Sequence, residues 1–179
     1  EVAGVATHVV GWMRDEATAE DAQRRERELD ADPKLAARLQ IVEPGGALID
    51  RGAYRQGDRA GSAGIEWSME PALRGLRGRR TVQLDSGEVA VLDAQPGLDA
   101  ALTLDAMLQA RVQALLAPEL GLAVVQPWHG KPNDTMPIGT PLHGAAVVLD
   151  IDTGDILALV SSPTFTRQDL RENPRAVFM

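Results

Sequence analysis

The chain has 179 residues, of which 44% are apolar and 25% are charged. This length and apolar content suffice for one domain or two small ones with a buried core. The formal net charge of -8 argues against general nucleic-acid binding, which needs a basic face to displace counterions. Cysteine is absent, which excludes disulfides, thiolate metal sites and a cysteine nucleophile.

The N-terminal part is predicted to hold one extended segment and two helices. Residues 2–13 are apolar and β-branched, which favours a short strand. Residues 15–30 are dense in charge, so we expect a solvated helix stabilised by ion pairs rather than by a buried face. Asp32 followed by Pro33 predicts an N-cap and first turn of a second helix through about Ile41. Residues 47–60 are irregular and polar.

A glycine-rich block over residues 61–78 is the most informative segment of the chain. Its glycines imply turns or close backbone approach. Two carboxylates, Glu66 and Glu70, precede two guanidiniums, Arg74 and Arg77, at spacings that share one helical face. We therefore expect charge-assisted hydrogen bonds that hold two pieces of backbone in a fixed relation. The residues singled out in this block are Gly61, Gly64, Glu66, Glu70, Arg74, Gly75 and Gly78.

The C-terminal half alternates hairpin and helix patterns. Strand patterns on either side of Ser86-Gly87 predict a β-hairpin with a two-residue turn over residues 81–92. Asp105 is placed to cap an amphipathic helix over residues 106–117. Residues 126–142, with four prolines, are expected to be a loop. Apolar strands flank Asp152-Thr-Gly-Asp155 and predict a second hairpin over residues 145–161. The apolar face of the helix predicted over residues 106–117 is assigned to Met107, Leu108, Val112, Leu115 and Leu116.

The sequence offers no pattern for a metal or cofactor. The three histidines are scattered, and no two lie at metal-ligand spacing. Asp150, Asp152 and Asp155 resemble a calcium loop only superficially, because Ile151 interrupts the oxygen ligands and no glutamate follows at the twelfth position. We expect these aspartates to form a turn, with Gly154 taking a positive φ.

The sequence contains one motif that is also found in catalytic sites. Asp152-Thr153-Gly154 matches the three-residue motif of aspartic proteases, which would need a second copy to supply the other carboxylate. A tight turn is the simpler interpretation, and the protease stays as an alternative. The serines lie neither in Gly-x-Ser-x-Gly nor three residues before a lysine, so acyl-transfer machinery is not evident and no catalytic residue is assigned.

Four segments, read in order, resemble the N-terminal region of class B penicillin-binding proteins, the peptidoglycan transpeptidases. The segment Ala6–Trp12 is similar to an apolar segment of that family, and Tyr54–Gly78 is similar to its pedestal signature. The segment Leu102–Gln109 resembles the opening of the transpeptidase domain, and Gly144–Pro163 resembles its first hairpin, with Asp150, Thr153 and Gly154 at the turn. The elongation type is slightly favoured over the division type.

The resemblance implies an α+β chain of two parts. Residues 1–97 would form a non-catalytic pedestal, or dimerisation-type, domain with a charged helical insertion at about 15–41. Residues 98–179 would be the start of a transpeptidase domain that ends before the Ser-x-x-Lys nucleophile motif. The chain would then be an excised piece of a larger, penicillin-sensitive D,D-transpeptidase rather than an enzyme itself. A stand-alone interaction module or β-lactam sensor is a further alternative.

The same resemblance implies a location and partners. The parent protein is expected on the periplasmic side of the bacterial inner membrane, held by a transmembrane helix that this chain does not include. Expected partners are the rest of its own transpeptidase domain and, through the pedestal, cell-wall elongation or division proteins. A homodimer is a further candidate, because the final hairpin is apolar on both faces and can expose a pairing edge. No nucleic acid, cofactor or metal is expected.

The chain also departs from the family pattern. Met69 stands where the family usually has an aromatic residue, and Thr166-Arg167 replaces the usual residues after the last hairpin. Residues 15–53 and 126–142 have no clear counterpart and are interpreted as insertions.

Overall fold

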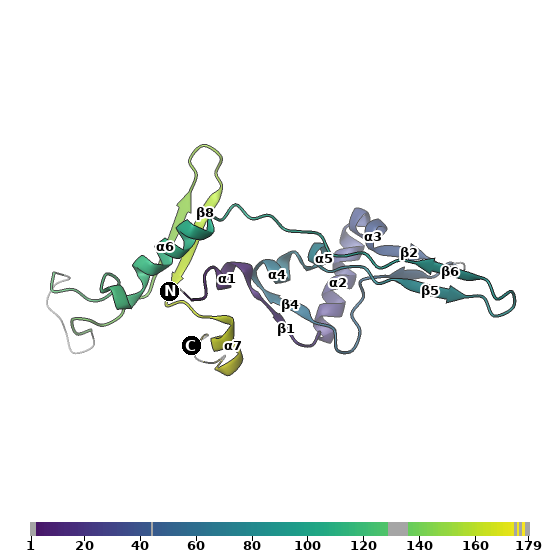
Figure 1. The fold of residues 1–179 in the computed structure, drawn as a ribbon, viewed down its shortest axis with the longest axis horizontal. Helices are drawn as coiled ribbons and strands as arrows, with labels where there is room; N and C mark the ends of the chain where they lie inside the picture. Colours follow the sequence, from purple (N-terminus) through teal and green to yellow (C-terminus); the bar gives the residue numbers. More distant parts are fainter. Residues whose placement is uncertain (1–2, 44, 129–135, 174, 176, 178–179) are drawn as a thin grey trace. The chain divides into compact units, whose positions relative to one another are not determined.

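A computed structural model describes residues 3–43, 45–128, 136–173, 175 and 177. The chain divides into two compact units. One spans residues 11–100, and the other combines the N-terminal residues up to Val10 with residues from Ala101 onward. Both contain short helices and two-stranded antiparallel sheets (Figure 1), which confirms the expected α+β class. In the described part of the chain, no helix is both long and apolar enough to cross a membrane.

The unit of residues 11–100, called the pedestal unit below, holds three two-stranded sheets. β1 pairs with β4, β2 with β3, and β5 with β6, all antiparallel. The elements in chain order are β1 (Trp12–Arg14), α2 (Ala19–Ala31), α3 (Pro33–Leu39), β2 (Gln40–Val42), β3 (Leu48–Asp50), β4 (Ala60–Ala63), α4 (Gly64–Ser68), α5 (Glu70–Leu73), β5 (Arg79–Val82) and β6 (Val89–Leu92).

Local capping sets the ends of α2 and α3. Thr18 and Asp21 form a reciprocal capping box at the start of α2. Asp32 accepts hydrogen bonds from the backbone of Lys34 and Leu35 at 2.9 and 3.2 Å, which confirms the predicted N-cap before Pro33. The helix ends at Leu39, earlier than predicted, because the next three residues enter β2. The pairing of β2 with β3 was not predicted.

Two expectations for the N-terminal segments are wrong. Residues 7–10 form a short helix, α1 (Thr7–Val10), where a strand was expected. The charged helix α2 has a buried face, made by Asp21, Arg25 and Leu29. The charge pattern did not indicate this face, because two of its three residues are charged. Asp21 is buried against Thr18 and Arg14, and Arg25 against Asp50 from another segment, so both charges are paired. Leu29 packs in the small apolar core of the pedestal unit with Leu39 and Leu76.

The predicted hairpin over residues 81–92 is confirmed as β5 and β6, but its turn is longer than expected. Val82 pairs with Val89, and the backbone amide of Gln83 donates to the carbonyl of Glu88 at 2.8 Å. The turn therefore spans residues 84–87 rather than two residues, with Gly87 at φ 72° in the left-handed region.

The second unit is built from a helix lying against a hairpin. Figure 1 shows α6 beside β8, and the contacts between these two elements are extensive. Asp105 caps α6 as predicted, accepting from Met107 and Leu108 at 2.8 and 2.9 Å. The elements are α1, α6 (Ala106–Leu116), the 3-10 turn η1 (Pro118–Leu120), β7 (Gly144–Leu149), β8 (Ile156–Ser162) and α7 (Arg167–Glu172).

The face that α6 buries matches the predicted apolar stripe only in part, since Leu108, Val112 and Leu116 are half-buried. Gln109 and Gln113 are buried, whereas Met107 and Leu115 are more than half exposed. The reason is that the glutamines donate to backbone carbonyls of β8 and of the N-terminal segment. The second predicted hairpin is confirmed as β7 and β8. Residues 129–135 of the predicted loop 126–142 lie outside the described residues. Pro141, in the described part of this loop, forms an isolated antiparallel β-bridge with Val124.

Candidate functional site

The chemically distinctive feature of the pedestal unit is a cluster of three arginines and two carboxylates, called the arginine–carboxylate cluster below. Its members are Arg24, Asp58, Glu70, Arg74 and Arg77. They come from α2, from the loop before β4, and from the segment that begins with α5. The cluster thus joins segments that are far apart in the sequence.

Glu70 is the buried carboxylate of the cluster, with a residue exposure of 4%. It begins α5, where Pro71 fits the first helical turn. One of its oxygens accepts from the backbone amide of Gly61 at 3.1 Å and from Arg24 at 3.0 Å. Arg74, one helical turn later, lies 3.7 Å from the other oxygen. Glu70 therefore links β4, α2 and its own helix.

Asp58 is the shared acceptor for two guanidiniums. Arg74 donates to it at 2.6 Å, Arg77 donates to the same oxygen, and the backbone amide of Arg55 donates at 2.7 Å. Burial opposes the ionised carboxylate, but the hydrogen bonds from Arg77 and Arg55 and the nearby positive charges hold the pKa of Asp58 below its ordinary value of 3.8. Asp58 is therefore the ionised centre of the cluster.

The arginines also donate to backbone carbonyls of the loop that precedes β4. Arg74 donates to the carbonyls of Gly52 and Arg59 at 2.7 and 3.0 Å, and Arg77 donates to the carbonyl of Ala53. The planar guanidinium has five donors, so a single arginine can hold several acceptors at once. Residues 52–59 are consequently held by Arg74 and Arg77, although they form no regular helix or strand.

A second buried ion pair supports this loop from α2. Arg25 donates to both oxygens of Asp50, one of them at 2.7 Å. Burial opposes the charge of Arg25, yet the bonded carboxylate of Asp50 raises the pKa of the guanidinium. A side chain on Gly52 would overlap with the Arg25 guanidinium, so Arg25 would have to shift away from its position against Asp50.

Two aromatic rings cover arginines of the cluster. The guanidinium carbon of Arg74 lies 4.2 Å from the ring centre of Tyr54, and that of Arg24 lies 4.7 Å from the ring centre of Trp67. Burial, followed by hydrogen bonding with Glu70, raises the pKa of the Tyr54 hydroxyl far above its ordinary value. Tyr54 therefore keeps its proton at neutral pH.

The glycines of the motif permit close backbone contacts. A side chain on Gly61 would overlap with the carbonyl of Glu66. A side chain on Gly75 would come within 2.6 Å of the Gln95 carbonyl, and one on Gly78 within 2.9 Å of the Ala94 amide nitrogen. Gly64 adopts a φ of 60°, which non-glycine residues rarely adopt. Glycine at these positions lets β4 approach α4, and lets the chain at Gly75 and Gly78 approach residues 92–97, which follow from the end of β6.

The arrangement differs from the predicted pairing in one respect. Glu66 is half-buried in α4, and the ion pairs that the structure gives Arg74 and Arg77 are with Glu70 and Asp58. Sequence reasoning missed Arg24 and Asp58 as cluster members. The available clue was the position of Asp58 directly after Gly57 within the family-like segment 54–66. Arg24 gave no clue, because it looks like any other charge on a polar helix.

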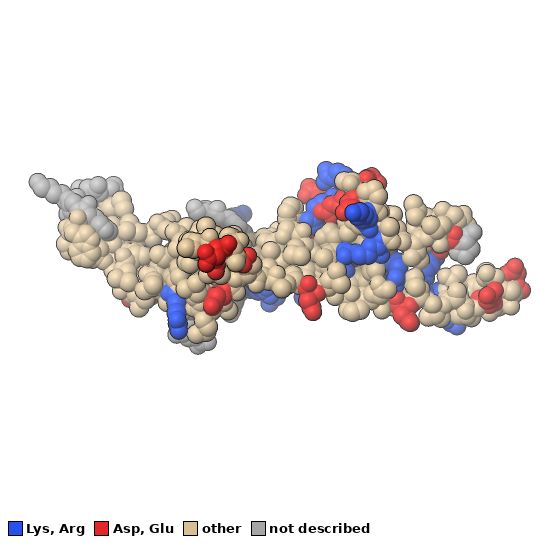
Figure 2. Space-filling model, turned by 90° about the horizontal axis from the view of Figure 1, so that it is seen from above, with Lys and Arg blue, Asp and Glu red and all other residues tan. Residues whose placement is uncertain are grey.

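Figure 2 shows a surface of mixed sign. Most of the basic side chains visible on that face lie over the pedestal unit, with acidic side chains interspersed among them. A phosphate-binding face would need positive charge that is not neutralised by its neighbours. Here the arginines of the cluster are committed to carboxylates and backbone carbonyls, so the cluster serves to hold structure together.

The Asp-Thr-Gly segment of the second unit forms the turn between β7 and β8. Asp150 accepts from the backbone amides of Asp152 and Thr153 at 2.9 and 3.1 Å, and these bonds lower the pKa of Asp150. Gly154 has a φ of 78°, as the turn interpretation requires. Asp152 is exposed at the tip. This geometry is that of an Asx turn, and a buried carboxylate for protease chemistry does not lie there.

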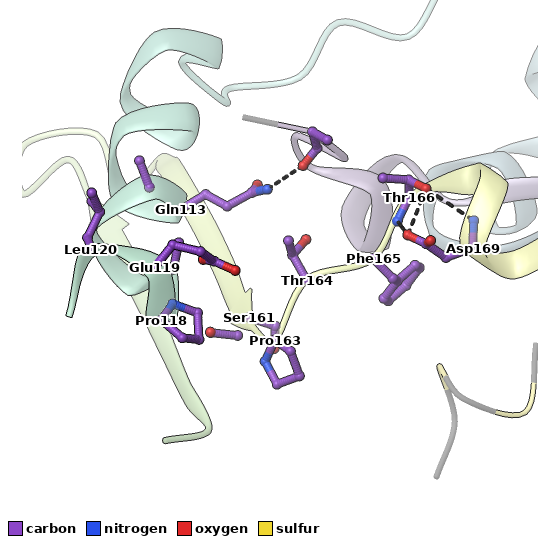
Figure 3. Close-up of a pocket in the computed structure, with 14 residues that line it drawn as sticks. Gln113, Pro118, Glu119, Leu120, Ser161, Pro163, Thr164, Phe165, Thr166 and Asp169 are labelled. Atoms are coloured by element: carbon purple, nitrogen blue, oxygen red, sulfur yellow. Dashed lines mark hydrogen bonds between the residues drawn. The ribbon is translucent and has the colours of Figure 1, made fainter. Parts of the chain in front are cut away.

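The second unit also contains an open cavity of about 550 Å³ between the end of α6 and the chain that follows β8. Figure 3 shows Pro118, Glu119, Pro163 and Phe165 around it. The hydroxyl of Ser162 donates to the carbonyl of Leu116 at 2.9 Å and is thereby occupied. Among the described residues, no group of three or more histidines or carboxylates is arranged to hold a metal ion.

Comparison with known proteins points to one family. Residues 2–99 match the model of the penicillin-binding protein dimerisation domain. The chain is 28% identical over 123 residues to a peptidoglycan D,D-transpeptidase, FtsI, of Escherichia coli K12, covering 66% of this chain and 18% of that protein. It is 37% identical over 116 residues to a probable peptidoglycan D,D-transpeptidase, PenA, of Neisseria flavescens, covering 60% of this chain and 25% of that protein.

One solved structure with a similar chain is a penicillin-binding protein, PBP2, from Helicobacter pylori. The sequences are 20% identical, and the TM-score is 0.42 over 94% of this chain and 24% of that chain. This chain therefore spans about a quarter, or less, of the length of each relative it matches. The E. coli match covers more of this chain than residues 2–99 can account for, so similarity continues past residue 99.

Proposed function

We propose that the pedestal unit supports the catalytic domain of a peptidoglycan D,D-transpeptidase. The premise is that this chain belongs to the family of penicillin-binding protein dimerisation domains. The observation that carries this proposal is the arginine–carboxylate cluster, which lies within the residues that match the family. Its function in the proposal is mechanical: it keeps short helices and hairpins, which could not be stable alone, in one rigid arrangement.

The rigidity follows from how the ion pairs are distributed. Glu70 connects β4 to α2 through Gly61 and Arg24, and Asp58 connects the preceding loop to α5 and the chain after it through Arg74 and Arg77. The apolar core of the unit is small, so these charge-assisted bonds replace much of the packing that a larger core would provide. A unit held together in this way would keep the segments attached to it at fixed relative positions.

The proposal assigns no catalysis to this chain. Residues 98–179 are proposed to be the beginning of the transpeptidase domain, and the similarity to FtsI beyond residue 99 supports this assignment. Of the motifs expected of a serine D,D-transpeptidase, Ser-x-x-Lys and Lys-Thr-Gly do not occur in the sequence. The penicillin-sensitive reaction therefore belongs, in this proposal, to the parent protein.

Location and partners follow from the same family. The pedestal unit is proposed to work on the periplasmic side of the inner membrane, where peptidoglycan is made. Its proposed contacts are the rest of its own transpeptidase domain and a protein of the cell-wall elongation or division machinery. The elongation type remains the preferred prediction.

Covalent labelling by a fluorescent penicillin tests the non-catalytic assignment. The purified chain should show no covalent label after gel electrophoresis, while an active transpeptidase in the same experiment is labelled. A label on the chain that is lost on competition with unlabelled penicillin would contradict the proposal, because it would require an acylated serine within these 179 residues.

Export of the chain into the periplasm of a Gram-negative host tests the scaffold role. A folded pedestal unit should compete with the host's own protein for its partner, giving round cells if elongation is blocked and filaments if division is blocked. Arg74→Ala should remove the effect, and Arg59→Ala, which changes an exposed ion pair, should keep it. Unaltered cell shape at high periplasmic levels of the folded chain would contradict partner binding.

A further inference from the structure

The chain passes between its two units twice. The first connection is at Val10–Gly11, and the second connection is at Ala100–Ala101. The pedestal unit is proposed to hold a catalytic domain, so the residues of the pedestal unit that fix these two connections are the ones through which it can do so.

The first connection is fixed to the start of α4. Directly after it, β1 pairs with β4, and Trp12 lies opposite Ala63. Gly11 is buried and has a φ of 84°, in the left-handed region. A side chain on Gly11 would overlap with the carbonyl of Ala63 and come within 3.0 Å of the Cα of Gly64. The chain that enters the pedestal unit therefore passes directly against the peptide that begins α4.

The second connection is fixed to the end of α5. The backbone amide of Leu98 donates to the carbonyl of Ala72 at 2.9 Å. A side chain on Gly97 would overlap with the carbonyl of the last residue of α5. Just before these residues, Gln95 and Leu76 exchange two backbone hydrogen bonds of 2.8 Å each. The chain that leaves the pedestal unit is therefore paired with α5 and with the residues that follow it.

The helices α4 and α5 form one continuous piece. The backbone amide of Met69 donates to the carbonyl of Ile65 at 2.9 Å and ends α4. The carbonyl of Met69 accepts from the amides of Ala72 and Leu73, both at 2.9 Å, and begins α5. Residues 63–73 are called the α4–α5 segment below. The two connections are thus fixed to its opposite ends.

The arginine–carboxylate cluster holds the middle of the α4–α5 segment. Arg24 donates to the carbonyl of Trp67 in α4 at 3.1 Å and to the carboxylate of Glu70 in α5 at 3.0 Å. Glu70 in turn accepts from the amide of Gly61 in β4. One guanidinium from α2 therefore binds both helices of the segment, and charge-assisted bonds of this kind are stronger than neutral ones.

The second connection contains few residues that are free to absorb a movement. Beyond it, the hydroxyl of Thr103 donates to the carbonyl of Ile156 at 2.7 Å, and the amide of Asp105 donates to the carbonyl of Leu157 at 2.9 Å. Residues 99–102 alone separate Thr103 from Leu98. Four residues extend by at most about 3.6 Å each, so a large displacement of Leu98 has to be followed at Thr103.

We propose that the α4–α5 segment is the shared anchor of both connections, so that a displacement of this segment moves them together. The inference rests on the scaffold role proposed above and adds regulation to it. A partner that displaces α4–α5 acts on the catalytic domain through both connections at once. Gly11 and Gly97 are then positioning residues, because each permits the close backbone contact that fixes one connection.

Hydrogen exchange of the 179-residue chain, followed by mass spectrometry of its peptides, tests the shared anchor. Gly97→Ala disturbs the second connection, and it should speed exchange about tenfold or more both in residues 94–98 and in residues 11–15. Gly11→Ala should have the same effect on both stretches. Gly87→Ala, which strains the turn between β5 and β6 instead, should leave both stretches near their wild-type rates.

The exchange of α2 distinguishes a shared anchor from a general loss of stability. The helix belongs to the same unit but lies on neither connection. A general weakening would speed exchange in α2 as much as elsewhere, because all amides would then open by the same unfolding. The shared anchor requires the increase to be confined to the two connections and the α4–α5 segment.

Glu70→Gln provides a second variant that keeps the size of the side chain and alters neither connection directly. It removes the buried charge from the middle of the α4–α5 segment, so exchange should rise in both connections together. Glu28→Gln is the matched control, since Glu28 pairs with the same Arg24 at 3.7 Å but lies on α2. It should leave both connections near wild type.

Two results would overturn the shared anchor. Exchange could rise only at the connection that carries the substitution, or it could rise equally in α2 and in both connections. Either result leaves the scaffold role standing if the chain stays unlabelled by penicillin and still competes in the periplasm. A penicillin label on the chain would instead overturn the proposed function, whatever the exchange rates show.

Discussion

Arg74 donates to Asp58 at 2.6 Å across sixteen residues of sequence, while its own helix places it 3.7 Å from Glu70. The side chain of Arg74 is 14% exposed and that of Asp58 is 23% exposed, so solvent weakens this pair only partly. Arg74 also donates to the carbonyls of Gly52 and Arg59. This single side chain thus connects α5 to most of the loop that precedes β4.

Replacing Arg74 by alanine should destabilise the pedestal unit by about 2–4 kcal/mol, because Asp58 loses one of its two guanidiniums and the carbonyls of Gly52 and Arg59 lose this donor in a partly buried place. Urea unfolding followed by circular dichroism measures the change. Arg59→Ala is the matched control, since its ion pair with Asp15 is exposed and should be worth at most about 1 kcal/mol. Equal midpoints for the two variants would refute the structural role of Arg74.

Asp58 should make the stability of the chain fall at acidic pH. Its folded-state pKa is lowered, so its stabilisation is complete above the ordinary value of 3.8 and is lost as the pH falls through the folded-state pKa. Asp58→Asn should be less stable than wild type at neutral pH, and the difference should shrink below about pH 4. Urea unfolding of both proteins across this pH range measures it. A difference that stays constant down to acidic pH would contradict the assignment.

Gly61→Ala should destabilise the pedestal unit by about 1–3 kcal/mol or more, because the added methyl group overlaps with the carbonyl of Glu66 and backbone must move. Gly45→Ala is the matched control, since no atom lies near the added group there. Thermal unfolding compares the two. If Gly61→Ala and Gly45→Ala have the same melting temperature, the close approach of β4 to α4 does not constrain the residue at position 61.

Gln109→Leu should destabilise the second unit by about 2–4 kcal/mol, although it keeps a side chain of similar size, because the amide and carbonyl of Leu159 lose their partners. Hydrogen exchange should show faster exchange of the Leu159 amide. Gln168→Leu, which removes an exposed hydrogen bond to Glu172, should leave the stability of the second unit and the exchange rate of the Leu159 amide near their wild-type values. Unchanged protection at Leu159 would mean that Gln109 does not close the edge of β8.

The sequence patterns that succeeded were local ones. Asp32-Pro33 and Asp105 predicted helix starts because a cap depends on a residue and its next three neighbours. The two hairpins were found because alternation and glycine act over a few residues. The aspartates around Gly154 were recognised as a turn for the same reason.

The patterns that failed depended on distant partners. The helix over residues 19–31 looked fully solvated, yet Arg25 is buried because Asp50 meets it from another segment. The stripe of apolar residues on α6 was only partly right: Leu108, Val112 and Leu116 are half-buried, but Gln109 and Gln113 are the buried residues, since they find backbone partners in other parts of the unit. Periodicity cannot show this, because it treats every glutamine and arginine as solvent-facing.

The sequence by itself determined the α+β class, the three longest helices, two of the hairpins, and the resemblance to the penicillin-binding protein family, since each of these depends on short, ordered segments. Only the tertiary structure decided which carboxylate each arginine meets. It brought Asp58 to Arg74 and Arg77, a partner that the spacing of Glu66, Glu70 and the two arginines did not indicate, because the loop that carries Asp58 folds back onto α5. It also decided what closes the outer edge of β8, because the closing side chain, Gln109, comes from a helix fifty residues away. Both are matters of long-range packing, for which one chain's sequence holds no local pattern.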